Sequence, residues 1–276
     1  MPQALAVARY TLIELTRRRL LVVIVAIGVV LMAGIAIAPH VLPGQQTDTD
    51  RVIVMLTALS AEVPYAITLC AFAVGMTVIN HDLDSGAVIS IFAKPVSRAS
   101  YTGGKLLAAI SLLLLIAAIF TVGSLGVVAA NGGSVYGVVF WTCAALAANI
   151  VLLMLLVMAL TVSVNNIVAA ALVLILHYVA GQVLTLHAMV QHNIITDAIA
   201  KAVITAFYWG VPHELTSGLQ RQILQLQIQA GELRFQGNSP LDRLPNASGA
   251  VDIAFWFAYV VAIVLILFWS VRRKQV

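Results

Sequence analysis

Charged residues are scarce in this chain of 276 residues. Lysine, arginine, aspartate and glutamate make up 9% of it, whereas a soluble domain carries about 25%. Hydrophobic residues make up 62%, and the mean hydropathy is +1.03. So few charges cannot cover so much apolar surface in water. This composition excludes an ordinary soluble domain and indicates a protein embedded in a lipid bilayer.

Cysteine is also scarce, with Cys70 and Cys143 as the only two. Both lie inside apolar runs, where we expect them to pack rather than to form a disulfide or share a metal. The histidines His177, His187 and His192 follow one another at spacings that do not place them together on one helical face. We therefore predict no metal site.

The chain also lacks nucleotide-binding and catalytic patterns. The segment Gly103–Lys105 is followed by Leu106 and lacks the first glycine of a phosphate-binding loop, Gly-x-x-x-x-Gly-Lys-Ser/Thr. No loop combines a nucleophile, a base and an acid, and basic residues do not alternate with aromatic ones. The sequence thus predicts no enzyme, no bound cofactor and no nucleic-acid partner.

What the chain does have is six apolar runs long enough to cross a bilayer, which takes about 20 helical residues. They are Leu20–Ala38, a segment within Val52–Ile79, Leu106–Ala130, Tyr136–Val162, Ile167–His187 and Val251–Val271. The first run is too long for the apolar part of a signal peptide, so we expect it to remain as a span. The predicted fold is a single all-α membrane domain over residues 1–276, with six transmembrane helices and additional interfacial amphipathic helices.

Basic residues are unevenly distributed between these runs. If the N-terminus is cytoplasmic, ten of the 15 basic residues face the cytoplasm: Arg9, Arg17, Arg18, Arg19, Lys94, Arg98, Lys105, Arg272, Arg273 and Lys274. Such an excess is typical of the cytoplasmic side. We therefore predict cytoplasmic termini, a cytoplasmic loop at 80–105 and an outer loop region at 188–250. The membrane is expected to be a plasma membrane or a bacterial inner membrane.

The N-terminal segment, residues 1–19, is predicted to be an amphipathic helix at the inner membrane surface. Leu5, Ala8, Leu12 and Leu15 recur at helical spacing and form its apolar side. The alternative is a frayed basic tail.

The first part of the outer region, residues 193–212, predicts a second interfacial helix. Tyr208 and Trp209 are expected at the level of the lipid headgroups, and Pro212 is expected to end the helix. A seventh span is disfavoured because Lys201 would lie near its centre.

The rest of the outer region is rich in glutamine. Between residues 224 and 235, apolar residues first alternate with glutamine and a glycine then follows. This pattern predicts a small hairpin, and a glutamine-rich helix is the alternative.

The cytoplasmic loop predicts a short helix. Asp84 and Ser85 can cap it, residues 88–92 give it an apolar side, and Pro95 disfavours helix at Lys94. Such a helix either rests on the lipid surface or fits a groove in a cytoplasmic partner. Composition alone does not decide between these two.

The segment "DLDSGAVISIFAKPVSRASYTGGKLL" resembles the cytoplasmic loop of ABC-type transporter permeases of the type-2 exporter class. The matching positions are Asp82, Asp84, Ser85, Gly86, Lys94, Pro95, Arg98, Gly104 and Lys105. The resemblance extends weakly over the rest of the chain. It departs at Ala87, where threonine is common, and in the glutamine-rich outer insertion.

This resemblance implies that the loop is a coupling helix that docks on a separate ATPase subunit. The chain would then be the permease subunit of an ATP-driven exporter, with ATP bound by its partner. A second permease chain, identical or different, would complete the pathway. An intramembrane enzyme, an ion-coupled secondary transporter, and a membrane anchor or assembly factor are the competing interpretations.

Glu62 is the one carboxylate inside the long apolar stretch 52–79. A carboxylate in the middle of a bilayer is costly and is therefore a candidate for the transport path. The stretch is longer than one span needs, however, and Pro64 suggests a break beside it. We prefer a position at the outer mouth, where replacing Glu62 would have little effect.

Overall fold

The computed structural model describes residues 2–17, 19–41, 48–84, 97–130, 136–229 and 240–273. Within these ranges all regular structure is helical, which confirms the predicted all-α class. The elements are α1 (Pro2–Thr16), α2 (Arg19–Val41), α3 (Asp48–Thr77), α4 (Asn80–Asp84), α6 (Arg98–Ala130), α7 (Tyr136–Thr161), α8 (Asn166–Gln191), α9 (Ala198–Gly210), α10 (Leu219–Gln229), the 3-10 helix η1 (Pro240–Arg243) and α11 (Ala250–Arg273).

Five helices in the described part are long and apolar enough to cross a bilayer. They are Val52–Asp82, Arg98–Ala130, Gly137–Thr161, Asn166–Gln191 and Ala250–Arg273, and they coincide with five of the predicted runs. The remaining run forms α2, which meets α1 at 61° and adds a sixth span when the bent pair counts as one. The structure thus supports a polytopic membrane protein with five spans, or up to six.

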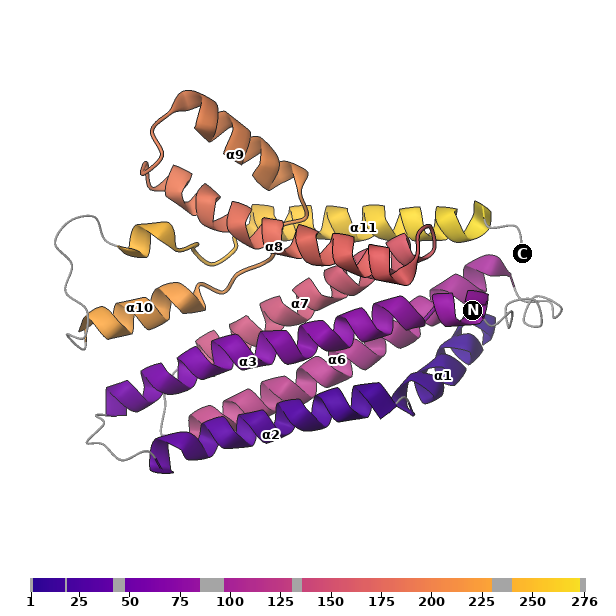
Figure 1. The fold of residues 1–276 in the computed structure, drawn as a ribbon, viewed down its shortest axis with the longest axis horizontal. Coiled ribbons are helices and arrows are strands. Elements are labelled where there is room, and N and C mark those ends of the chain that lie inside the picture. The colour runs from indigo at the N-terminus through magenta and orange to yellow at the C-terminus, as the bar shows by residue number, and fades with distance from the viewer. Residues whose placement is uncertain are drawn as a thin grey trace.

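The helices form an elongated bundle (Figure 1). Helices α2, α3, α6 and α7 run side by side, and α8 and α11 lie on the other side of α7. In α7, 56% of the residues of the apolar spanning segment are buried inside the protein. The corresponding share is 17% in α8 and in α11, so α7 is the centre of the bundle. Both chain ends and the start of α6 lie at one end, while α9, α10 and η1 lie at the opposite end.

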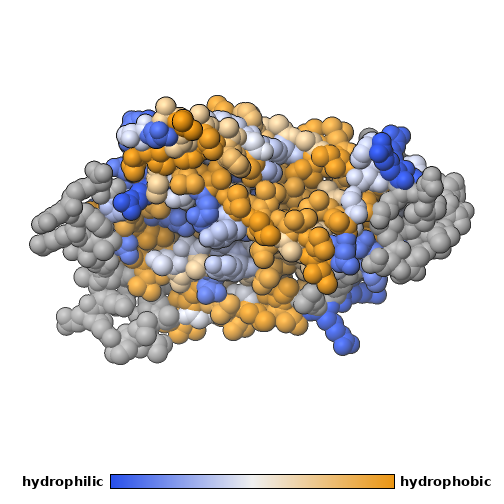
Figure 2. All heavy atoms as spheres, turned by 45° about the horizontal axis from the view of Figure 1, so that its top comes forward, coloured by the Kyte–Doolittle hydropathy of each residue, from blue (hydrophilic) through white to orange (hydrophobic). Residues whose placement is uncertain are grey.

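The surface of the bundle has both apolar and hydrophilic regions. Figure 2 shows a broad apolar area over the middle of one face, hydrophilic residues at its two ends, and a hydrophilic patch that extends from the left end toward the middle. Large apolar side chains on this surface include Leu174, Ile175 and Leu265, each more than half exposed. Apolar side chains in such an area are suited to lipid or to another membrane helix.

The N-terminal helix is present, and it packs on the protein. Thr11 and Leu15 of α1 are buried, whereas Leu5, at the start of the predicted apolar stripe, is exposed. Helix α1 runs in close contact with the first part of α6. A frayed tail is therefore excluded for Pro2–Thr16, and a position at the membrane surface remains a prediction.

The outer region is partly as predicted. Asp197 accepts a hydrogen bond from the Ala200 backbone N–H and caps α9, which ends at Gly210, two residues before Pro212. The hairpin prediction is wrong for residues 224–229, because they belong to the helix α10. The alternative, a glutamine-rich helix, is what the structure has there. Residues 230–235 of that prediction lie outside the described ranges.

Pro64 does not break α3, which contradicts the expected break beside Glu62. The helix continues from Asp48 to Thr77 with Pro64 inside it. A proline has no backbone N–H, so the Ser60 carbonyl loses its usual helical donor at that turn. Membrane helices tolerate this when neighbouring groups or water satisfy the carbonyl.

Candidate functional site

A buried ionic cluster lies between α1, the short helix α4 and the first turns of α6. The Lys105 Nζ is 2.8 Å from Asp82 Oδ2 and 3.8 Å from Glu14 Oε2. The Tyr101 hydroxyl donates a hydrogen bond of 2.8 Å to the same Asp82 oxygen. Lys105, Asp82 and Tyr101 are all buried, whereas Glu14 is partly exposed. We call Glu14, Asp82, Tyr101 and Lys105 the ionic cluster.

The local sequence explains how these groups meet. Tyr101 and Lys105 are four residues apart on α6, so they lie on one face of the helix. Asp82 reaches this face because α3 ends at Thr77 and the short helix α4 turns the chain toward α6. Both buried charges therefore have partners, which a buried ion pair needs in order to persist. The cluster fixes the base of the loop to α1 and α6.

Gly104 allows α1 to approach α6 beside this cluster. A Cβ atom at position 104 would lie 2.6 Å from the Ala4 carbonyl oxygen and 2.7 Å from the Val7 Cβ. Contacts this short do not occur in folded proteins, so any side chain there would displace α1. Only glycine lets the two backbones pack at this distance.

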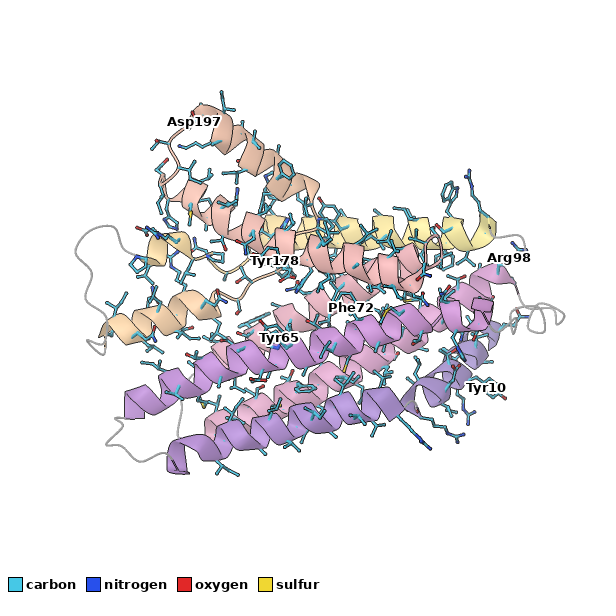
Figure 3. All side chains as sticks on the ribbon, in the orientation of Figure 1. Tyr10, Tyr65, Phe72, Arg98, Tyr178 and Asp197 are labelled. Atoms are coloured by element: carbon cyan, nitrogen blue, oxygen red, sulfur yellow. The ribbon has the colours of Figure 1, made fainter. Side chains whose placement is uncertain are left out.

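Two further hydrogen bonds tie the same end of the bundle together. The Asn80 side-chain amide donates to Asn166 Oδ1 at 2.6 Å, which joins the start of α4 to α8. The Arg98 Nη1 donates to the Arg272 carbonyl at 3.0 Å, which joins α6 to α11. Figure 3 shows Arg98 at this end of the bundle and Asp197 at the other. The helices at the two ends of the loop, α4 and α6, are thus attached to each other and to three further helices, α1, α8 and α11.

The structure brings together several of the residues that carry the resemblance. Asp82 and Lys105 bond directly, Gly104 lies against α1, and Arg98 begins α6. Asp84 ends α4. The positions Ser85, Gly86, Lys94 and Pro95 lie outside the described residues. Sequence reasoning missed Tyr101 and Glu14, although the spacing of Tyr101 and Lys105 was a usable signal.

A cavity of about 380 Å³ lies inside the bundle between α3, α6, α7, α8 and the segment 211–218. Its apolar walls include Leu56, Leu59, Val63 and Leu146, and its polar lining includes Ser60, Ser124, Thr142, Asn149, Gln182, Thr185, Glu214 and Ser217. This volume lies within the range of about 300–1,000 Å³ that is typical of small-molecule sites.

The segment 211–218 forms one wall of the cavity and is held in place as a strap. Asn149 makes two hydrogen bonds of 2.8 Å to the Leu215 backbone, one donated by its amide and one accepted from the Leu215 N–H. The Thr142 and Ser217 hydroxyls are 2.8 Å apart. The Ser248 N–H donates to the Thr216 carbonyl at 2.8 Å, and the Thr216 N–H donates to Ser248 Oγ at 2.9 Å. The strap is therefore held mainly by hydrogen bonds that involve side chains, and not by the regular backbone hydrogen bonds of a helix or a sheet.

A stack of rings lies beside the strap. Tyr208 is sandwiched between His187 and His213, with ring centroids 3.9 Å and 4.1 Å apart, and its hydroxyl donates to Asp252 Oδ1 at 2.8 Å. Burial raises the pKa of the Tyr208 phenol, and the Asp252 carboxylate raises it further, so the hydroxyl stays protonated. Burial lowers the pKa of His213 and favours its neutral form.

The predicted interface residues therefore contact protein groups. The Tyr208 ring is buried in the stack, and the Trp209 carbonyl accepts a hydrogen bond from the Tyr259 hydroxyl at 2.5 Å. Pro212 lies at the start of the strap. Their place at the level of the lipid headgroups remains a prediction.

Glu62 is exposed on α3, and it is not among the described residues that line the cavity. The carboxylate that does line the cavity is Glu214 of the strap, which pairs with His177 Nδ1 on α8. Sequence reasoning did not select Glu214. No signal marked it, because it lies outside the apolar runs.

The described residues contain no group of three or more metal-binding side chains. Cys70 and Cys143 are both buried and free. Comparisons of the chain with protein-family models and with curated proteins find no match. Function is therefore inferred from the ionic cluster, the cavity and the arrangement of the bundle.

Proposed function

We propose that the chain is the membrane-spanning permease subunit of an ATP-driven transporter of the ABC type, working as an exporter. Its loop at 80–105 would dock on a separate ATPase subunit, which binds and hydrolyses the ATP. A second permease chain, identical or different, would complete the pathway against an exposed apolar face of the bundle. Both termini would face the cytoplasm.

The observation that carries this proposal is the ionic cluster at the base of the loop. A buried ion pair adds little stability compared with apolar side chains of the same size. What it does supply is a fixed, directional attachment between α4, α6 and α1. A loop that only rested on lipid would not need so firm a base, whereas a loop that transmits force to the spans would.

The geometry of the bundle supports the same proposal. The loop base and both chain ends lie at one end, and the cavity reaches the segments near α10 and η1 at the other. A device that couples cytoplasmic ATP hydrolysis to movement of a solute needs these two features at separate places. It also needs a continuous connection between them, which α3 provides.

The orientation is tested by labelling single cysteines from outside intact cells. In a chain with Cys70 and Cys143 replaced by alanine, a cysteine at Thr196 should react with a membrane-impermeant maleimide, and one at Ser97 should react only after the cells are opened. Both positions are exposed, so accessibility of the side chain is not limiting. The reverse labelling pattern would contradict the proposed orientation.

The coupling is tested with the tagged chain purified from its native membranes together with whatever ATPase it retains. The charge reversal Asp84→Arg should abolish or strongly reduce the co-purified ATP hydrolysis while the chain remains in the membrane. Glu62→Gln is the matched control, because Glu62 is an exposed carboxylate on a span away from the loop. ATP hydrolysis that is absent from the unaltered preparation, or unchanged by Asp84→Arg, would refute the proposal.

A further inference from the structure

Three hydroxyl groups that line the cavity donate their protons to backbone carbonyls of their own helices. Ser60 Oγ donates to the Thr57 carbonyl at 2.8 Å, and Thr185 Oγ1 donates to the Gly181 carbonyl at 3.3 Å. Thr142 Oγ1 donates to the Val138 carbonyl at 2.8 Å. A hydroxyl carries one proton and two lone pairs. These three groups can therefore offer only lone pairs to a molecule in the cavity.

The same reasoning applies to Ser217. Its hydroxyl is 2.8 Å from Thr142 Oγ1, whose single proton is already directed at Val138. Ser217 must then be the donor of that bond, and it too keeps only lone pairs. The Ser60 carbonyl adds another acceptor, since Pro64 provides no N–H to it and both residues line the cavity.

Glu214 gives the cavity its charge. It is the only aspartate, glutamate, lysine or arginine among the described residues that line it. One of its oxygens contacts His177, which lies on the far side of the carboxylate in a smaller adjoining pocket. The lining thus has one formal negative charge, several acceptors and no formal positive charge, which disfavours an anion.

Ser124 also lines the cavity, but its hydroxyl oxygen is buried against protein atoms. Its hydroxyl is buried and has no hydrogen-bond partner among the described residues. The thiol of Cys143 lies beside it, but a thiol is a weak hydrogen-bonding group. A buried hydroxyl without a partner lowers stability unless water or a ligand satisfies it.

We propose that this cavity binds a small amphiphilic molecule with a protonated amine. The ammonium N–H groups would donate to the Glu214 carboxylate and to the lone pairs of Ser60, Thr142 and Ser217. The aliphatic part would lie against Leu56, Leu59 and Val63. This inference builds on the proposed function by naming the class of cargo, yet binding itself requires no ATPase.

The test measures binding of octylamine to the purified chain in phosphatidylcholine nanodiscs at pH 7, where the amine is charged. Octanol, octanoate and octyltrimethylammonium are the comparison probes. Octylamine should bind about tenfold more tightly than octanol, because a charge-assisted hydrogen bond is stronger than a neutral one. Octyltrimethylammonium has the charge without N–H donors and should fall between them, and octanoate should be the weakest.

Glu214→Gln removes the negative charge with little change in shape. It should weaken octylamine binding by about tenfold and leave octanol binding unchanged. Glu62→Gln is the matched control and should change neither. Equal binding of octylamine and octanol, or an unchanged affinity in Glu214→Gln, would refute the proposal and indicate a cavity filled with water.

A second pair of variants keeps the test valid if Glu214→Gln does not fold. Gly181 lines the cavity, and a Cβ atom there would meet nothing within 4 Å, so Gly181→Leu should fill the space without moving a helix. Gly126 is equally open but is not among the cavity-lining residues described, which makes Gly126→Leu its control. Octylamine binding should be lost only in Gly181→Leu. Binding that survives this change would place the molecule elsewhere.

The two proposals fail in different ways. If the cavity does not bind amines but the co-purified ATPase depends on Asp84, the permease proposal stands and this inference falls. If octylamine binds as expected but no ATPase accompanies the chain, the site stands and the transport mechanism falls.

Discussion

Replacing Lys105 with methionine is expected to lower the free energy of unfolding by about 3–5 kcal/mol, the usual cost of removing one partner of a buried ion pair. Lys105 and Asp82 are both almost fully buried, and their charged atoms are 2.8 Å apart. Methionine keeps most of the side-chain volume but removes the ammonium group that lies 2.8 Å from the buried Asp82 carboxylate. The measurement is thermal unfolding of the purified chain in detergent, followed by tryptophan fluorescence.

The double variant Asp82→Leu with Lys105→Met is the control for this experiment. Replacing both charges with apolar side chains removes the uncompensated carboxylate, so most of the lost stability should return. If the ion pair serves to attach the loop, the double variant should remain stable and yet fail to support ATP hydrolysis. A loss below about 1 kcal/mol in Lys105→Met would instead indicate that the ionic cluster is hydrated and exposed.

Replacing Gly104 with alanine is expected to destabilise the packing of α1 on α6 by about 1–3 kcal/mol, the typical cost of overpacking a close contact. The new Cβ would lie 2.6 Å from a backbone oxygen of α1, which cannot turn away as a side chain can. Helix α1 must therefore move. The same thermal measurement detects the loss, and faster proteolysis at the N-terminus detects the displacement of α1.

The neighbouring glycine provides a matched control. A Cβ atom at Gly103 would be 3.8 Å from its nearest neighbour, the Phe268 ring, which is an ordinary contact. Gly103→Ala should therefore stabilise α6 by up to about 1 kcal/mol, since alanine is the better helix former. Equal effects of the two substitutions would show that the close approach of α1 at Gly104 is wrong.

The long apolar runs made the spans predictable, because a backbone in lipid must satisfy its own hydrogen bonds and does so as a helix. The cap at Asp197 and the end of α9 before Pro212 follow from local rules of the same kind. The alternation around Leu224 misled, because the side chains that pack on the bundle, Leu219, Ile223 and Leu226, recur at helical spacing and begin before the alternating stretch.

The sites were much less predictable. Asp82 and Lys105 were selected through a resemblance, and their direct pairing depends on how α4 turns back onto α6, which no local pattern encodes. Glu62 attracted attention because it interrupts an apolar run, while the carboxylate inside the bundle is Glu214 in an irregular strap. A strap placed by side chains such as Asn149 leaves no periodic signal in the sequence.

The continuity of α3 has a mechanical consequence. Its 30 residues correspond to about 45 Å of helix, and backbone hydrogen bonds continue through the turn at Val78 to Asp82. This rod is followed by α4, which holds Asp82 of the ionic cluster, and it carries part of the cavity wall midway, at Ser60 and Pro64. A torque applied to α4 would reach the cavity wall through the turn at Val78 and then along α3. Pro64 removes one backbone bond at that wall, so the rod is most easily bent at the point where the cavity would change shape.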